Sequence, residues 1–146
     1  MTIFESIRDD HQIQRRLIDL LVQTEGDSDG RRELFDRLRN QLAAHAAAEE
    51  RFFYAPMMDH DASQEAARHS VAEHHELDEL IEQLEGYDMS GPAWLPTARH
   101  LAERLIHHLD EEEVEIFPVA GRVLDDEQKS ALADEYRSDM ERRTSA

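Results

Sequence analysis

The sequence predicts an all-α protein: an up-down-up-down four-helix bundle with a short extra C-terminal helix. Apolar residues recur at helical spacing along the chain, and the alternating pattern of strands is absent. Most of the 5 glycines and 4 prolines fall between these periodic segments. A length of 146 residues fits a single domain. We therefore expect one domain over 1–146, with a core bundle at about 2–122 and a covering helix at about 125–142.

The first two helices form one predicted hairpin. Thr-Ile-Phe-Glu (2–5) is a capping box that begins the first helix, and TEGDSDG (24–30) ends it. The second helix is expected from about Arg31 to Pro56. Its inward leucines are Leu34, Leu38 and Leu42.

The remaining helices follow the same logic. Asp61 and Gln64 predict a cap for the third helix, and GYDMSGP (86–92) forms the next loop. The fourth helix should be kinked or ended by Pro118, because proline lacks the backbone N–H. Asp-Asp-Glu-Gln (125–128) caps the covering helix, whose inward residues are Leu132, Tyr136 and Met140.

Charge and composition exclude several function classes. The chain has 34 acidic and 16 basic residues, a net charge of −18. This charge argues against a nucleic-acid partner and against an anionic membrane surface. No apolar run approaches the ~20 residues of a membrane span, and MTIFESIRDDH has neither region of a signal peptide. There is no cysteine, so thiolate chemistry is excluded, and we expect a cytoplasmic protein.

An internal repeat organises the histidines. When the sequence is shifted by 63 residues, the superimposed pairs are His11 and His74, His45 and His108, and Glu49 and Glu112. Each half contains an acid followed by His, then 34 residues later His-x-x-x-Glu-Glu, and then an aromatic residue and Pro. The repeat therefore predicts two similar helical hairpins.

Helix geometry places these residues in one layer. Because a helix rises about 1.5 Å per residue, the arms of each hairpin bring their histidines to a similar height. Residues four apart share a helix face, so Glu49 lies beside His45 and Glu112 beside His108. The bundle core should therefore contain four imidazoles and two carboxylates at one level.

Such a layer predicts a metal centre. Burying these groups unpaired would cost several kcal/mol each. Six ligands are too many for one tetrahedral zinc ion. They suit two octahedral ions bridged by the carboxylates, with positions left for a solvent bridge or a small ligand. Iron is the preferred metal by ligand type, and manganese and zinc rank behind it.

Neighbouring histidines leave alternatives. His74 is preferred over His75, because it lies 34 residues before His108 and follows an acid, as His11 does. The same register prefers His108 over His107. The residues expected at the surface or rim are His60, His69, His100, His107 and Arg104.

Glu50 and Glu113 flank the predicted ligands and have two interpretations. They could accept a hydrogen bond from a histidine N–H, but exposed charges are favoured. A ferritin-like site would need Glu-x-x-His, and no histidine has Glu three residues before it.

The chain resembles the hemerythrin-like domain family, also called the HHE cation-binding family. The matching stretches are DDH (9–11), HAAAEERFFYAP (45–56), AEHHEL (72–77) and HHLDEEEVEIFP (107–118). The resemblance implies a non-haem di-iron centre with the ligands His11, His45, Glu49, His74, His108 and Glu112.

The resemblance also implies a small ligand: O2, NO or peroxide. The expected role is oxygen or redox sensing or protection. The alternatives are a di-iron enzyme that decomposes peroxide or reduces NO, and an iron store. Oxygen-carrying hemerythrins have a further histidine one turn from the first on the third helix, where this chain has Ser70 and Asp78. This difference argues against simple oxygen transport. If the role is sensing, a protein partner could receive the signal.

Overall fold

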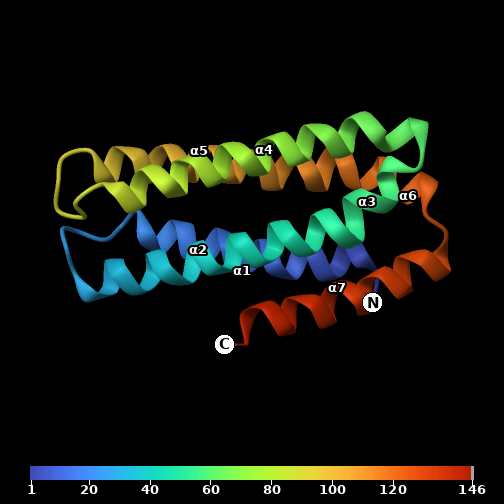
Figure 1. Cartoon of the computed structure of the whole chain (residues 1–146), viewed down its shortest axis with the longest axis horizontal. Coiled ribbons are helices and arrows are strands. Elements are labelled where there is room, and N and C mark those ends of the chain that lie inside the picture. The colour runs from blue at the N-terminus through green and yellow to red at the C-terminus, as the bar shows by residue number, and fades with distance from the viewer. Residues whose placement is uncertain (146) are drawn as a thin grey trace.

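The computed structural model describes residues 1–145 and confirms the predicted fold class. Consecutive long helices run antiparallel, and no strand occurs among the described residues (Figure 1). The four long helices are α1 (Ile3–Leu21), α2 (Asp29–Glu49), α4 (Asp61–Gly86) and α5 (Trp94–Glu111).

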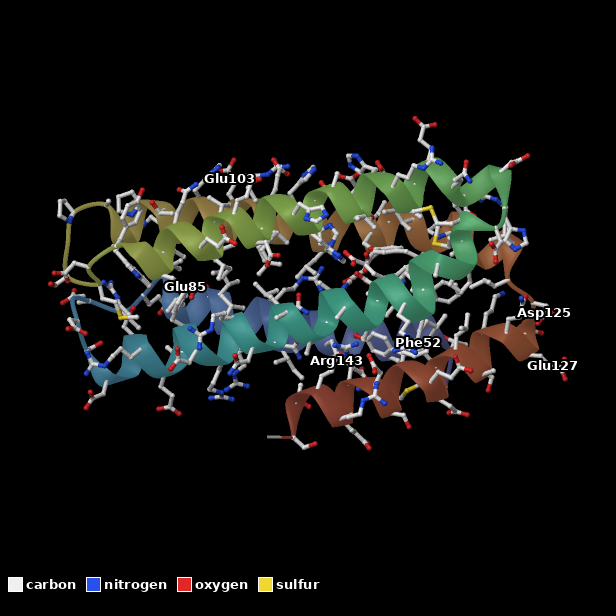
Figure 2. All side chains as sticks on the ribbon, viewed as in Figure 1. Phe52, Glu85, Glu103, Asp125, Glu127 and Arg143 are labelled. Atoms are coloured by element: carbon white, nitrogen blue, oxygen red, sulfur yellow. The ribbon has the colours of Figure 1, made fainter. Side chains whose placement is uncertain are left out.

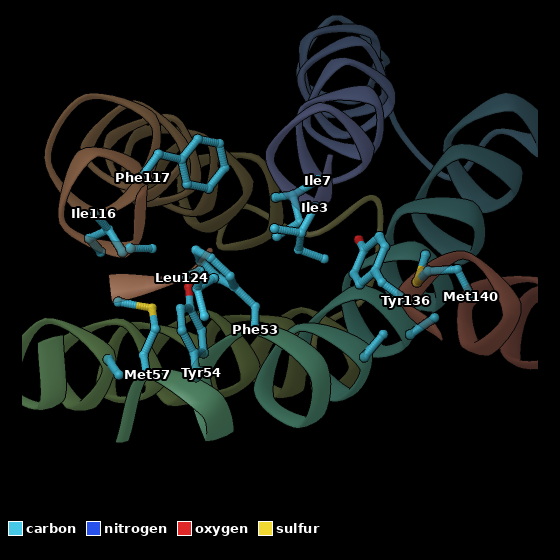
Figure 3. Packing of buried hydrophobic residues seen from close by; sticks show 14 residues of the cluster. Ile3, Ile7, Phe53, Tyr54, Met57, Ile116, Phe117, Leu124, Tyr136 and Met140 are labelled. Atoms are coloured by element: carbon cyan, nitrogen blue, oxygen red, sulfur yellow. The ribbon is translucent and has the colours of Figure 1, made fainter. Parts of the chain in front are cut away.

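The extra C-terminal helix, α7 (Asp126–Thr144), packs along α1 and α2 (Figure 1). Its N-terminus has the predicted capping box, in which Asp125 and Gln128 bond to each other's backbone N–H. The box predicted at Thr2 and Glu5 is also present. Tyr136 points from α7 into the bundle (Figure 3).

Two short π-helical segments interrupt the second and fourth helices of the bundle. They are η1 (Glu50–Tyr54), which leads into α3 (Ala55–Met58), and η2 (Glu112–Ile116), which leads into α6 (Phe117–Val123). In both, the N–H after the segment bonds to the carbonyl five residues earlier, and not four. Segments of this kind occur frequently at functional sites.

The π segments change the prediction for the prolines. Pro118 lies in the first turn of α6, and Pro56 in the first turn of α3, where a missing N–H removes no helical bond. The α-helix is interrupted upstream, from Glu112, so the prediction that Pro118 itself kinks or ends the helix is wrong.

The predicted cap of the third helix is also wrong. α4 begins at Asp61, so His60 occupies the cap position, and its side chain makes no capping bond. Gln64 Nε2 donates instead to the Met58 carbonyl, at 3.1 Å. The helix starts one residue earlier than the cap pattern requires.

Two apolar clusters fill the bundle on either side of a polar layer. One cluster includes Ile7, Phe53 and Phe117 (Figure 3). The other includes Leu17 and Trp94. On α1 the residues between Ile7 and Leu17 include the buried polar side chains of the layer.

The outer surface carries the acidic charge. Side chains such as Glu103, Asp125 and Glu127 project away from the bundle (Figure 2). None of the helices in the described part of the chain combines the length and apolar composition that a membrane crossing requires.

Candidate metal centre

The structure brings the six predicted ligand residues together in the bundle core. Each of the four long helices contributes one histidine, and the two glutamates lie where α2 meets η1 and where η2 begins. None of the six is more than 8% exposed; they are His11, His45, Glu49, His74, His108 and Glu112. Metal binding by these residues stays a prediction, which the following geometry supports.

The six residues form two groups that share both glutamates. The groups are His11, His45, Glu49 and Glu112, and His74, His108, Glu49 and Glu112. Within each group the ligand atoms lie within 4.8 Å of one another. Two carboxylates common to two groups are what a pair of bridged ions requires.

Each glutamate reaches one histidine from each half of the chain. The distances from carboxylate oxygen to Nε2 are 3.4 Å for Glu49 to His45, 3.0 Å for Glu49 to His74, 3.1 Å for Glu112 to His11 and 3.8 Å for Glu112 to His108. The Tyr54 hydroxyl donates a further hydrogen bond to Glu112 Oε2. Both bridging candidates are therefore fixed from several sides.

The other ring nitrogen of every histidine has a partner outside the centre. The Nδ1 distances are 2.6 Å for His11 to Glu113, 3.1 Å for His74 to Glu50, 2.8 Å for His108 to Glu73 and 2.5 Å for His45 to the Tyr136 hydroxyl. A proton held on Nδ1 leaves the lone pair of Nε2 directed at the centre, as metal-ligating histidines require. The four imidazoles are thus oriented for coordination.

These partners correct the interpretation that favoured exposed charge for Glu50 and Glu113. Both are partly buried and accept hydrogen bonds from histidine rings. They lie in the π-helical segments, where each residue turns the chain by a smaller angle than in an α-helix, so they face different directions from those that α-helical spacing predicts. Sequence reasoning also missed the role of Glu73 as a partner of His108. The pattern that could have indicated this role is the acidic residue that precedes the first histidine of each hairpin.

The acid in the first hairpin needs an intermediary. Asp10 occupies the place that Glu73 has in the second hairpin, but its side chain is one methylene shorter. Asp10 Oδ2 lies 3.9 Å from His45 Nδ1, and the Tyr136 hydroxyl bridges them by donating to Asp10 at 2.5 Å. Tyr136 has no counterpart in the repeat, so only the docking of α7 reveals this role.

Several atoms that face the centre make no hydrogen bond. Among the buried side-chain atoms without a hydrogen bond, seven belong to the six predicted ligands: Nε2 of His11, His45, His74 and His108, both carboxylate oxygens of Glu49, and Oε1 of Glu112. Each unsatisfied buried group costs about 1–3 kcal/mol. All of these atoms are good ligands for divalent metals, so the residues present fit a metal centre.

The pKa shifts of the buried glutamates and of His45 also support a metal centre. Burial, together with the charge of Glu49, holds the pKa of Glu112 well above its usual range. Burial opposes ionisation of Glu49, but His45 beside it holds the Glu49 pKa well below its usual range. Burial lowers the pKa of His45, yet Glu49 and Asp10 outweigh it and raise the value to about 9. Two ionised carboxylates at this distance would repel each other, so Glu112 resists ionisation, and cations between the two would relieve the repulsion.

A small cavity lies against the histidine layer. Its volume is about 20 Å³, enough for roughly one water-sized molecule. Its walls include His45, His74, His108 and aliphatic side chains of the second apolar cluster, namely Leu42, Leu77, Ile81 and Leu105. The centre can therefore receive a very small ligand in a largely apolar space.

The rival histidines lie elsewhere. His75 is exposed and points away from the layer, whereas His74 faces it. His69 and His107 are each 53% exposed and lie against Glu111. Arg104, expected at the surface, pairs with Glu76 at 3.3 Å.

Comparisons with known proteins agree with this geometry. The family model described as Hemerythrin HHE cation binding domain matches residues 2–120. A curated protein from a Nostoc species, named DNA nickase, is 29% identical over 138 residues; the match covers 94% of this chain and 39% of that protein. A crystal structure of a Hemerythrin HHE cation binding domain-containing protein from Mycobacterium kansasii has a TM-score of 0.88 and 22% identity, covering 98% of this chain and 87% of that one. The last likeness supports the fold.

Proposed function

Because this chain belongs to the hemerythrin HHE cation-binding family, we propose that its histidine and glutamate layer holds two iron ions that bind a small ligand. The observation that carries the proposal is that seven buried ligand atoms without a hydrogen bond belong to two adjoining groups of residues in the core. We propose O2, NO or peroxide as the ligand, and oxygen or redox sensing or protection as the role.

The ligand set supports iron. His11 and His45 would hold one ion, His74 and His108 the other, and Glu49 and Glu112 would lie between them. Imidazole and carboxylate together suit iron, with manganese and zinc behind it. Iron would supply redox activity and coordination positions for a small ligand.

The surrounding residues would perform three tasks. The Nδ1 partners keep the imidazoles oriented, and they would hold the Nδ1 proton when Nε2 binds an ion. The aliphatic wall of the cavity keeps bulk water away from the ligand position. The volume of the cavity, about 20 Å³, favours a very small molecule beside the histidines.

Only the name of the Nostoc relative refers to the nicking of DNA. This chain spans about 39% of that protein's length. A net charge of −18 repels a phosphate backbone. We therefore propose a small-molecule ligand for this domain in preference to DNA.

An enzyme with the same centre is the second candidate. The ligands would be the same, but peroxide would be decomposed or NO reduced with turnover. The apolar cavity beside the histidines suits either activity. Consumption of many equivalents of peroxide or NO per chain identifies the enzyme, and a stoichiometric adduct identifies the binder.

The test begins with metal content and the visible spectrum before and after air is admitted. We expect about two irons per chain and an oxygen-dependent absorption band. His74→Ala should lose bound metal, and His75→Ala, an adjacent exposed histidine, should keep it. Zinc or no metal after expression with ample iron refutes the di-iron centre, and loss of metal only in His75→Ala refutes the ligand assignment.

A further inference from the structure

We propose that the protein has a second, separate metal site at its surface, which binds one divalent transition-metal ion between α4 and α5. The site is built on His69, Glu73 and Glu111, whose ligand atoms lie within 4.8 Å of one another, and His107 lies beside Glu111 as a fourth residue. It goes beyond the buried centre, with which it shares no ligand.

Two pairs on adjacent helices build the site. His69 and Glu73 are four residues apart on α4, and His107 and Glu111 are four residues apart on α5, so each pair lies on one helix face. This is the same His-x-x-x-Glu spacing that supplies Glu49 and Glu112 to the core. Here the two histidines are exposed, and Glu73 lies between them and the core.

Three of the four residues already lie close enough to share one ion. Glu111 Oε1 lies 2.6 Å from His69 Nε2, and its other oxygen, Oε2, lies 2.8 Å from His107 Nε2. Glu73 Oε2 lies 3.6 Å from His69 Nε2 and 3.8 Å from His107 Nε2. Ligand atoms of a tetrahedral ion with bonds of ~2.0–2.2 Å are about 3.3–3.6 Å apart. An ion would separate His69 from Glu111 slightly, and His107 would turn from Glu111 Oε2 toward the ion to become the fourth ligand.

The position of Glu73 distinguishes this cluster from ordinary surface ion pairs. Its residue is only 5% exposed, so its charge is costly without a partner. Oε1 accepts from His108 at 2.8 Å. The side-chain nitrogens facing Oε2, those of His69, His107 and Arg104, are 3.6–3.9 Å away, beyond hydrogen-bond distance. The second carboxylate oxygen of Glu73 therefore faces His69 and His107 without a hydrogen bond to either.

Access and charge favour a cation. His69 and His107 are each 53% exposed, so an ion reaches them from solvent without opening the bundle. A surface hollow beside His69 and Glu111 is also lined by Glu65 and Glu115, which concentrate cations there. Two imidazoles with carboxylates select zinc-like transition metals over magnesium or calcium.

Glu73 also connects the two sites. One of its oxygens orients His108, and the other faces the surface site. An ion at the surface would draw electron density from the carboxylate and change the hydrogen bond to His108 Nδ1. This connection rests on the proposed function of the buried centre, whereas the surface site itself does not.

The test counts zinc ions on the full chain by calorimetric titration. We compare wild type with a His69→Ala/His107→Ala variant and with a matched His75→Ala/His100→Ala control, which removes two exposed histidines from the same two helices. Wild type and control should bind one more equivalent than the His69/His107 variant. Equal stoichiometry and affinity in all three proteins overturns the surface site, whatever the content of the buried centre.

The connection is tested separately by NMR on zinc-loaded protein. Filling the surface site should shift the Nδ1–H resonance of His108 and leave that of His11 unchanged, because the partner of His11 is Glu113. An unmoved His108 signal overturns the connection while the surface site stands.

Discussion

Replacing Tyr136 with phenylalanine tests whether α7 takes part in the metal centre or only covers the bundle. The tyrosine is fully buried, and its hydroxyl accepts from His45 Nδ1 and donates to Asp10, both at 2.5 Å. Phenylalanine keeps the ring and removes only the hydroxyl. The packing of α7 on α1 and α2 should therefore survive.

The magnitude follows from what the hydroxyl leaves behind. One lost bond involves the Asp10 carboxylate and the other an imidazole, so the unfolding free energy of the metal-free protein should fall by about 2–4 kcal/mol. Asp10 and His45 are 3.9 Å apart, too far for a direct bond without movement. Because His45 then loses its orientation, metal affinity should fall by about 10–100-fold.

Urea unfolding and competition with a chelator measure the two effects. Tyr87→Phe is the control, because Tyr87 is 41% exposed, and its unfolding free energy should change by less than about 0.5 kcal/mol. If Tyr136→Phe also changes stability by less than about 0.5 kcal/mol and leaves metal affinity at the wild-type value, the hydroxyl has no role in the centre.

Two further predictions concern the metal-free protein. Glu112→Gln replaces a buried carboxyl whose ionisation is unfavourable beside Glu49 with a neutral amide, so it should maintain or raise the unfolding free energy while lowering the metal stoichiometry; reduced stability with full metal content would contradict this. The pKa of His45 is about 9 in the folded protein and ~6.5 when unfolded. Its stabilisation is therefore complete below pH ~6.5 and lost as the pH rises through 9, a loss of about 2–3 kcal/mol between pH 7 and 10. The raised pKa of Glu112 acts in the same direction. Urea unfolding at both pH values should show the fall in wild type and a smaller fall in His45→Gln.

The sequence by itself determined the helices and the ligand layer. Helical periodicity and caps are local properties, so the four long helices and the box at Asp125 were predictable from neighbours in the chain. The repeat of 63 residues set the heights of the histidines, because helix rise is constant. It also distinguished His74 from His75, one of which the structure buries and the other exposes.

Only the tertiary structure decided how the layer is supported. The π segments at Glu50 and Glu112 change the helical phase, and no local propensity marked them. Glu73, Glu113 and Tyr136 hold histidines on other helices, so their roles depend on which helices pack together. Residues far apart in the chain come into contact only when their helices pack together. The spacing of residues within one helix does not predict how far a side chain lies from a side chain on another helix.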